Sequence, residues 1–199
     1  MASPDIGIGW TGSCSAIWES IRFGVKNNAT IETLSFRQKT LTQRVGYNPV
    51  PSQIFIENCS ALTSISFPNL TRSDWFSYVV YNNPALQSID FPVLDFGFPN
   101  GTTTLYPMFA ITANPSLTSI SFPLATFGFG AISRFVDWNF SDNALTQASV
   151  DMILNRLALS TFVVSSWIIL TGGTNSAPSA AGLADVAILN GRGCTVFHN

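Results

Sequence analysis

The chain has 199 residues, a length that favours one domain with a sizeable buried core. Only 10% of its residues are charged and 46% are hydrophobic, with 16 phenylalanines and a formal net charge of −2. This sparse and slightly negative charge disfavours binding to nucleic acid or to anionic lipid.

Targeting signals and cysteine chemistry are also weak in this sequence. No apolar run reaches the roughly 18 residues of a membrane span, and residues 1–5 lack the basic and apolar parts of a secretory signal. Either the chain does not use that route or a signal was removed before residue 1. Cys14, Cys59 and Cys194 are odd in number and lack metal-like spacing, so we expect free thiols, no bond between Cys14 and Cys194 within one monomer, and no metal or cofactor.

A thirteen-residue frame occurs three times, at residues 56–68, 80–92 and 111–123. Each copy has Asn or Cys at one position, which we call the anchor, followed by Leu three, Ile six, Phe eight and Pro nine residues later. The anchors are Asn28, Cys59, Asn83, Asn114, Asn143 and Gly173, spaced by 31, 24, 31, 29 and 30 residues. This internal repetition predicts a stack of about six coils, an α/β and mostly β solenoid.

An apolar-x-apolar pair precedes each anchor and predicts a short strand. We expect parallel strands at 23–25, 54–56, 78–80, 109–111, 138–140 and 168–170. The anchor side chains from Asn28 to Asn143 should turn inward, satisfy backbone groups of the bends and form one buried column, in which Gly173 takes the sixth position. The Pro after each Phe suits an extended return path.

Two helices are expected only late in the chain. Val150, Ile153, Leu154 and Leu157 share one face of a helix at about 147–158. A second helix should run from about 179 to 190 and stop at Asn190–Gly191, and 194–197 should form a terminal strand. We therefore divide the chain into an N-terminal capping segment (1–20), a solenoid (21–175) and a helix–strand cap (176–199).

The frame resembles leucine-rich repeats, particularly the BspA-like type of bacterial surface proteins, and the turn Asn82-Asn83-Pro84-Ala85-Leu86 is similar to receptor L domains. The last third, through Leu170-Thr171-Gly172-Gly173 to Gly193-Cys194, resembles a C-terminal block of tailed-phage and bacterial surface proteins. The resemblance implies a virion or cell-surface location and a role without enzymatic activity.

The sequence also places a row of apolar residues on the outer face of the predicted sheet. Phe55, Val79, Ala110 and Ile169 stand four residues before their anchors, and Ser77 and Trp167 share the outward row two residues earlier. Contiguous exposed apolar residues mark interfaces, although insertions of the same chain are an alternative cover. The interface candidates are Phe55, Glu57, Val79, Tyr81, Trp167 and Ile169.

Signs of catalysis are few. Asp137 and Asp142 would lie at opposite ends of one strand, about 16 Å apart, farther than the 5 to 9.5 Å of a glycosidase pair. His198 is the penultimate residue, where a solvated tail is expected. Phe96-Gly97-Phe98 and Phe127-Gly128-Phe129 recur in neighbouring coils and are interpreted as packing at a bend, with an aromatic grip on sugar as the alternative.

Together these features favour a non-enzymatic structural or binding module, of the kind that the resemblance places in a phage tail, fibre or capsid decoration. A bacterial surface adhesin is the alternative, and a carbohydrate-active solenoid enzyme is less favoured. Expected partners are other virion or surface proteins, copies of the chain itself, or a host-surface glycan, without nucleic acid or membrane insertion.

Overall fold

The computed structural model describes residues 22–37, 40–41, 52–70, 72–73, 76–93, 97–98, 108–122, 128–129, 137–160 and 165–199. These residues form mostly strands, together with two helices, and every strand pairing within them is parallel. The predicted capping segment 1–20 and Cys14 lie outside the described residues.

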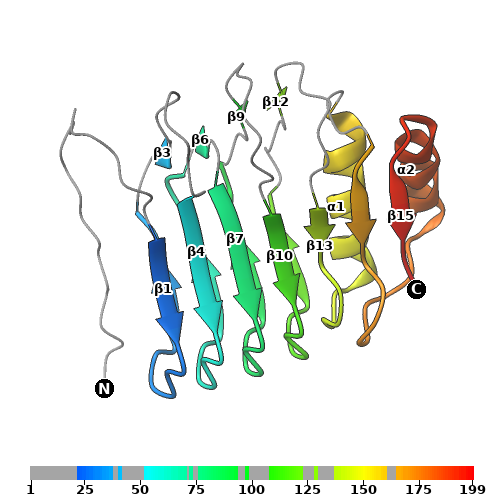
Figure 1. Ribbon diagram of the computed structural model, residues 1–199. Helices are drawn as coiled ribbons and strands as arrows, with labels where there is room; N and C mark the ends of the chain where they lie inside the picture. Colours follow the sequence, from blue (N-terminus) through cyan, green and yellow to red (C-terminus); the bar gives the residue numbers. More distant parts are fainter. Residues whose placement is uncertain are drawn as a thin grey trace.

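The largest layer is a seven-stranded parallel sheet, which runs the length of the described chain (Figure 1). Its order is β1 (Arg22–Lys26), β4 (Ser52–Glu57), β7 (Phe76–Tyr81), β10 (Met108–Thr112), β13 (Asp137–Asn139), β14 (Trp167–Ile169) and β15 (Thr195–Phe197). The expected parallel sheet is therefore confirmed, with the terminal strand as an added member. Its register aligns Phe23, Ile54, Tyr78, Phe109, Trp138, Ile168 and Val196.

A second parallel sheet is formed by the return segments, for which extended or irregular backbone was expected. Its order is β11 (Ser119–Ser121), β8 (Ser88–Asp90), β5 (Ser64–Ser66) and β2 (Thr33–Ser35). Two smaller pairings join β3 (Thr40–Leu41) to β6 (Arg72–Ser73) and β9 (Gly97–Phe98) to β12 (Gly128–Phe129). The two Phe-Gly-Phe segments are thus paired through their backbones, and their side chains lie outside the described residues.

The two expected helices are confirmed as α1 (Gln147–Leu159) and α2 (Ala180–Gly191). Thr146 caps α1 by accepting the Ser149 N–H, and the Ser179 hydroxyl accepts the N–H groups of Ala181 and Gly182 in α2. The carboxylate of Asp151 in α1 accepts the Ser179 N–H at 2.9 Å, which joins the two helices. Both helices lie behind the seven-stranded sheet in Figure 1, where α1 contacts β11 and α2 contacts α1 and β15.

The core between the two sheets contains a column of phenylalanines. Phe36 and Phe67 stack with ring centroids 4.6 Å apart, and Phe67 and Phe91 stack at 4.4 Å. The Tyr78 ring meets Phe67 and Phe91 edge-on, which is a favourable arrangement of aromatic quadrupoles. Parallel strands thus bring equivalent side chains of successive segments into van der Waals contact. Among the described residues, no helix is long and apolar enough to cross a membrane.

Candidate interaction surface

A ladder of buried asparagines holds the bends that follow the strands of the large sheet. Oδ1 of Asn83, Asn114 and Asn143 accepts the backbone N–H of the preceding anchor, Cys59, Asn83 and Asn114 respectively, each at 3.0 Å. The side-chain nitrogen of Asn114 donates to the carbonyls of Val80 and Thr112 at 3.2 and 2.9 Å, and the other two asparagines repeat this pattern. Because Cys59 and the three asparagines are fully buried, these bonds satisfy backbone groups that water cannot reach.

The two ends of the anchor series differ from the prediction. Asn28 is half-buried, because it lies at the first strand, and its Oδ1 accepts the N–H groups of Thr30 and Ile31. Gly173 is exposed at φ +55°, so its backbone fits against the preceding bend without contributing a side chain. Asn175, which sequence reasoning missed, is the buried residue there: it accepts the Leu145 N–H at 2.9 Å.

The chain end completes this bend. Nδ2 of Asn175 donates to the carbonyls of Phe140 and Leu170, both at 3.0 Å. Asn199 in turn donates to the Asn175 carbonyl at 2.7 Å and accepts the Gly172 N–H at 3.0 Å. The available sequence signal was an Asn two residues after the expected anchor, which the frame did not include.

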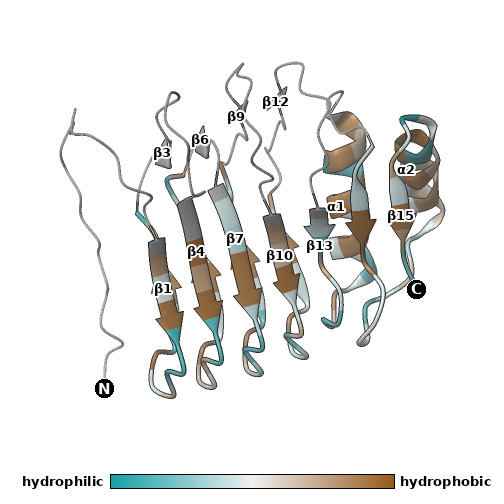
Figure 2. Ribbon diagram, in the orientation of Figure 1, coloured by the Kyte–Doolittle hydropathy of each residue, from teal (hydrophilic) through white to brown (hydrophobic). Residues whose placement is uncertain are grey.

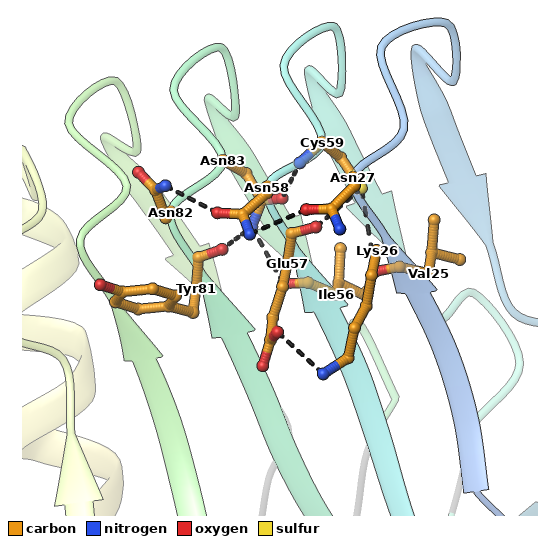
Figure 3. A network of polar contacts seen from close by, with 10 residues as sticks. All are labelled: Val25, Lys26, Asn27, Ile56, Glu57, Asn58, Cys59, Tyr81, Asn82 and Asn83. Carbon is orange, nitrogen blue, oxygen red and sulfur yellow. Dashed lines mark hydrogen bonds and ion pairs between the residues drawn. The ribbon is translucent and has the colours of Figure 1, made fainter.

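A second asparagine row lies on the surface, one residue before the anchors. Asn27, Asn58 and Asn82 have φ between 53° and 55°, a left-handed conformation that Asn tolerates better than most residues. Nδ2 of Asn82 donates to Oδ1 of Asn58 at 2.7 Å, and Nδ2 of Asn58 donates to Oδ1 of Asn27 at 3.0 Å (Figure 3). Ala113 holds the same conformation at φ 57° but has no amide with which to continue the row.

The outward face of the seven-stranded sheet carries apolar side chains that neither helix covers. Phe55, Val79, Ala110 and Ile169 are half-buried and lie in one register row, in which Asn139 stands between Ala110 and Ile169. Trp167 is 55% exposed and Phe197 is 45% exposed on the last two strands. Figure 2 shows apolar residues along the strands and hydrophilic ones in the turns beyond their ends.

The predicted exposure of Ser77 on this face is wrong. It was placed on an outward row with Trp167, yet it is only 2% exposed. Ser77 is paired with Gln53 in the sheet register and makes further interactions, so its small side chain is covered locally. The outer face therefore has less accessible surface at this end of β7 than the row pattern predicted.

An ion pair lies on this face at the end of the first two strands. Nζ of Lys26 lies 2.9 Å from a Glu57 carboxylate oxygen and 4.9 Å from the centre of the Phe55 ring. Tyr81 follows Glu57 in the register and is 47% exposed. In Figure 3, Lys26, Glu57 and Tyr81 run beside the row of Asn27, Asn58 and Asn82. The six interface candidates thus lie on one sheet face. Two of them, Glu57 and Tyr81, are the last residues of β4 and β7, as Lys26 is of β1.

The candidate chemical groups have limited support among the described residues. Nδ1 of His198 lies 2.9 Å from the Asn199 carbonyl oxygen. Asp142 is exposed, and the side chain of Asp137 lies outside the described residues. No group of three or more His, Cys, Asp or Glu side chains suited to a metal ion occurs in the described part of the chain. Cys59 and Cys194 are buried free thiols, and burial raises the pKa of each above its ordinary value.

No protein-family model, no curated protein and no solved structure matches the chain.

Proposed function

We propose that residues 21–175 form a leucine-rich-repeat-like solenoid of about six coils, capped by 1–20 and by 176–199. The proposal is supported by the spacing of the ladder, in which hydrogen bonds connect residues 24, 31 and 29 positions apart. The in-register phenylalanine stacks of the core support it as well. In such an architecture each coil contacts mainly its neighbours, and one face of the stack is left free.

The proposed function is that of a non-enzymatic structural or binding module of a phage virion, located in a tail, a fibre or a capsid decoration. The observation that carries the binding role is the outward sheet face, where Phe55 and Val79 lie on β4 and β7, and Ile169 shares β14 with the exposed Trp167. Apolar patches of this kind on a sparsely charged protein favour contact with other proteins or with further copies of the chain. The virion context comes from the resemblance of the repeats and of the C-terminal block.

Attachment to a surface glycan is the second candidate, as a bacterial adhesin would require. Tyr81 supports it, because it is exposed and paired with Glu57 in the register, at the strand ends that Asn58 and Asn82 follow (Figure 3). An aromatic ring packs against the apolar face of a sugar while amides and carboxylates bind its hydroxyls. A carbohydrate-active enzyme is less favoured, since the Glu57 carboxylate is engaged by Lys26 at 2.9 Å.

The test uses Trp167→Ser and Phe55→Asp, because Trp167 is 55% exposed and lies outside the buried core, while Phe55→Asp places a charge in the apolar row. Ser119→Asp is the control, since Ser119 is exposed on the other sheet. Both face variants should lose binding to purified phage or bacterial surface particles, or assembly with copies of the chain, by at least tenfold in affinity. The control should bind as the unchanged protein does.

Four outcomes test the candidates. Loss of particle binding in the face variants, with Tyr81→Ala unchanged, supports the protein interface. Loss of glycan-array binding in Tyr81→Ala alone supports the adhesin. Release of free sugar from glycans by the purified chain would contradict the non-enzymatic proposal, and unchanged binding in all three variants would contradict the use of this face.

A further inference from the structure

Exposed large apolar side chains gather at the C-terminal end of the described structure. Six such residues occur in the described part of the chain, and five of them lie between residues 159 and 197: Leu159, Trp167, Leu183, Ile188 and Phe197. The sixth is Tyr81. This end of the stack comprises α2 and β15, which lie together beyond β14 (Figure 1).

The solvent side of α2 carries no charge. Its buried residues are Gly182, Val186 and Leu189, and the exposed side includes Ala181, Leu183, Ala184, Ala187 and Ile188. The helix has one acidic side chain, Asp185, which is half-buried and accepts a bond from Asn155 in α1 at 3.4 Å. A surface helix ordinarily has charged residues on its outer face, and the last unit of a solenoid needs a polar outer surface to stay soluble alone. The outer face of α2 lacks these charges, so it is suited to being covered.

Beside α2, strand β15 is the last strand of the large sheet and has an open edge. The Thr195 N–H donates to Ser166 and the Phe197 carbonyl accepts from Leu170, so both residues bond toward β14. Because backbone groups alternate in direction along a strand, the N–H and carbonyl of Val196 point away from β14. Among the described strands none pairs with that side of β15. Such an edge is a ready template for another strand.

We propose that this end binds a second copy of the chain across a two-fold axis, with β15 antiparallel to its counterpart and α2 against α2. In this arrangement, Val196 of each copy exchanges two backbone hydrogen bonds with the other, and the large sheets join into one. A two-fold contact brings side chains near the axis opposite their own kind, so a charge there would face its like. The uncharged side of α2 meets this requirement, and its alanines allow close approach of the two helices.

This contact rests on the proposed assembly role and names the surface through which two copies meet. It is distinct from the outward sheet face, so the two can fail separately. A single helix and a three-residue strand make a small interface, and we therefore expect a dimer that dissociates on dilution in the micromolar range.

The experiment measures mass by sedimentation and native mass spectrometry of the full chain from about 1 to about 100 micromolar. Leu183→Glu and Ile188→Glu place like charges across the axis and should each weaken the dimer at least tenfold. The matched control is Ala148→Glu, which adds the same charge at an exposed position of α1. Circular dichroism and urea unfolding verify that all three variants fold.

A positive test uses Ala184→Cys in a Cys14→Ser background, which should give a disulfide-linked dimer on oxidation, while Ala148→Cys should not. A monomer across the whole concentration range, or a dimer unaffected by both glutamates, would overturn the inference. If Phe55→Asp disrupts self-association and Ile188→Glu leaves it unchanged, copies meet through the sheet face instead, and the proposed function survives without this contact.

Discussion

The backbone N–H of Asn83 donates to the side-chain oxygen of Asn114 at 3.0 Å, although 31 residues separate them in the chain. Both residues are fully buried, so water cannot replace this bond. Asn114 also donates to two backbone carbonyls from the same position. One side chain thus completes backbone bonding in two successive bends.

Replacing Asn114 with Ala should lower the free energy of unfolding by about 2 to 4 kcal/mol, because it leaves a buried N–H and buried carbonyls without partners. Urea denaturation monitored by tryptophan fluorescence gives the value. Asn82→Ala is the control, because Asn82 is exposed and its side chain donates a hydrogen bond to Asn58 in the surface row. This variant should lower the free energy of unfolding by about 1 kcal/mol. An Asn114→Ala variant no less stable than Asn82→Ala would refute the importance of the buried ladder.

Ala113→Asn should raise the free energy of unfolding by about 0.5 to 1 kcal/mol. Ala113 holds φ 57°, which costs more for Ala than for Asn, and the new amide lies in the row of Asn27, Asn58 and Asn82. Its Nδ2 is placed to donate to Oδ1 of Asn82. Thermal and urea unfolding measure the gain, and the double variant Asn82→Ala/Ala113→Asn should lose the hydrogen-bond part of it. A destabilised single variant would contradict this explanation.

Gly173→Ala should destabilise the protein by more than about 2 kcal/mol. A Cβ at Gly173 would lie 2.4 Å from the Asn143 carbonyl oxygen, and the residue holds φ +55°. Gly191→Ala is the matched control, because nothing lies within 4 Å of a Cβ there. Differential scanning calorimetry should find a lower Tm for the first variant and an unchanged or higher Tm for the second. Equal Tm values would mean that the close approach at Gly173 is relieved at little cost.

The buried thiols of Cys59 and Cys194 should resist modification in the folded protein. Burial raises the pKa of both above the ordinary value of 9.0, so the reactive thiolate is scarce at neutral pH. In a Cys14→Ser background, an aromatic disulfide reagent should label them slowly without denaturant and rapidly in urea. Rapid stoichiometric labelling of the native protein would contradict their burial.

The same shift gives a pH dependence with a definite sign. A pKa raised on folding means that the folded state holds the proton more tightly than the unfolded state does. The stability from the two thiols is therefore fully present below pH 9.0 and lost as the pH rises through the folded-state values. Cys59→Ser should reduce the alkaline loss of stability in urea unfolding at several pH values. An identical pH profile would exclude Cys59 as a contributor.

Periodicity was enough to place the strands of the large sheet and the two helices, because each inward apolar pair and each helical stripe is a local pattern. The same frame placed Asn83, Asn114 and Asn143, whose environments repeat. It failed at Gly173, the anchor that precedes α2, where the inward role passes to Asn175 two residues later. The Asp151 bond to Ser179 was also missed, since it depends on how two helices pack and not on spacing along either one.

The buried ladder also has a direction, with a consequence for synthesis on the ribosome. Each backbone N–H donates to a side chain that comes later in the chain: Cys59 to Asn83, Asn83 to Asn114, and Asn114 to Asn143. The Ile120 N–H similarly needs the hydroxyl of Ser149. A bend that has left the ribosome therefore lacks its hydrogen-bond partner until the next bend has also emerged. Asn175 and Asn199 supply the partners at the C-terminal end of this series. During synthesis these buried bonds are therefore completed in order, from the N-terminal bends toward the C-terminal ones.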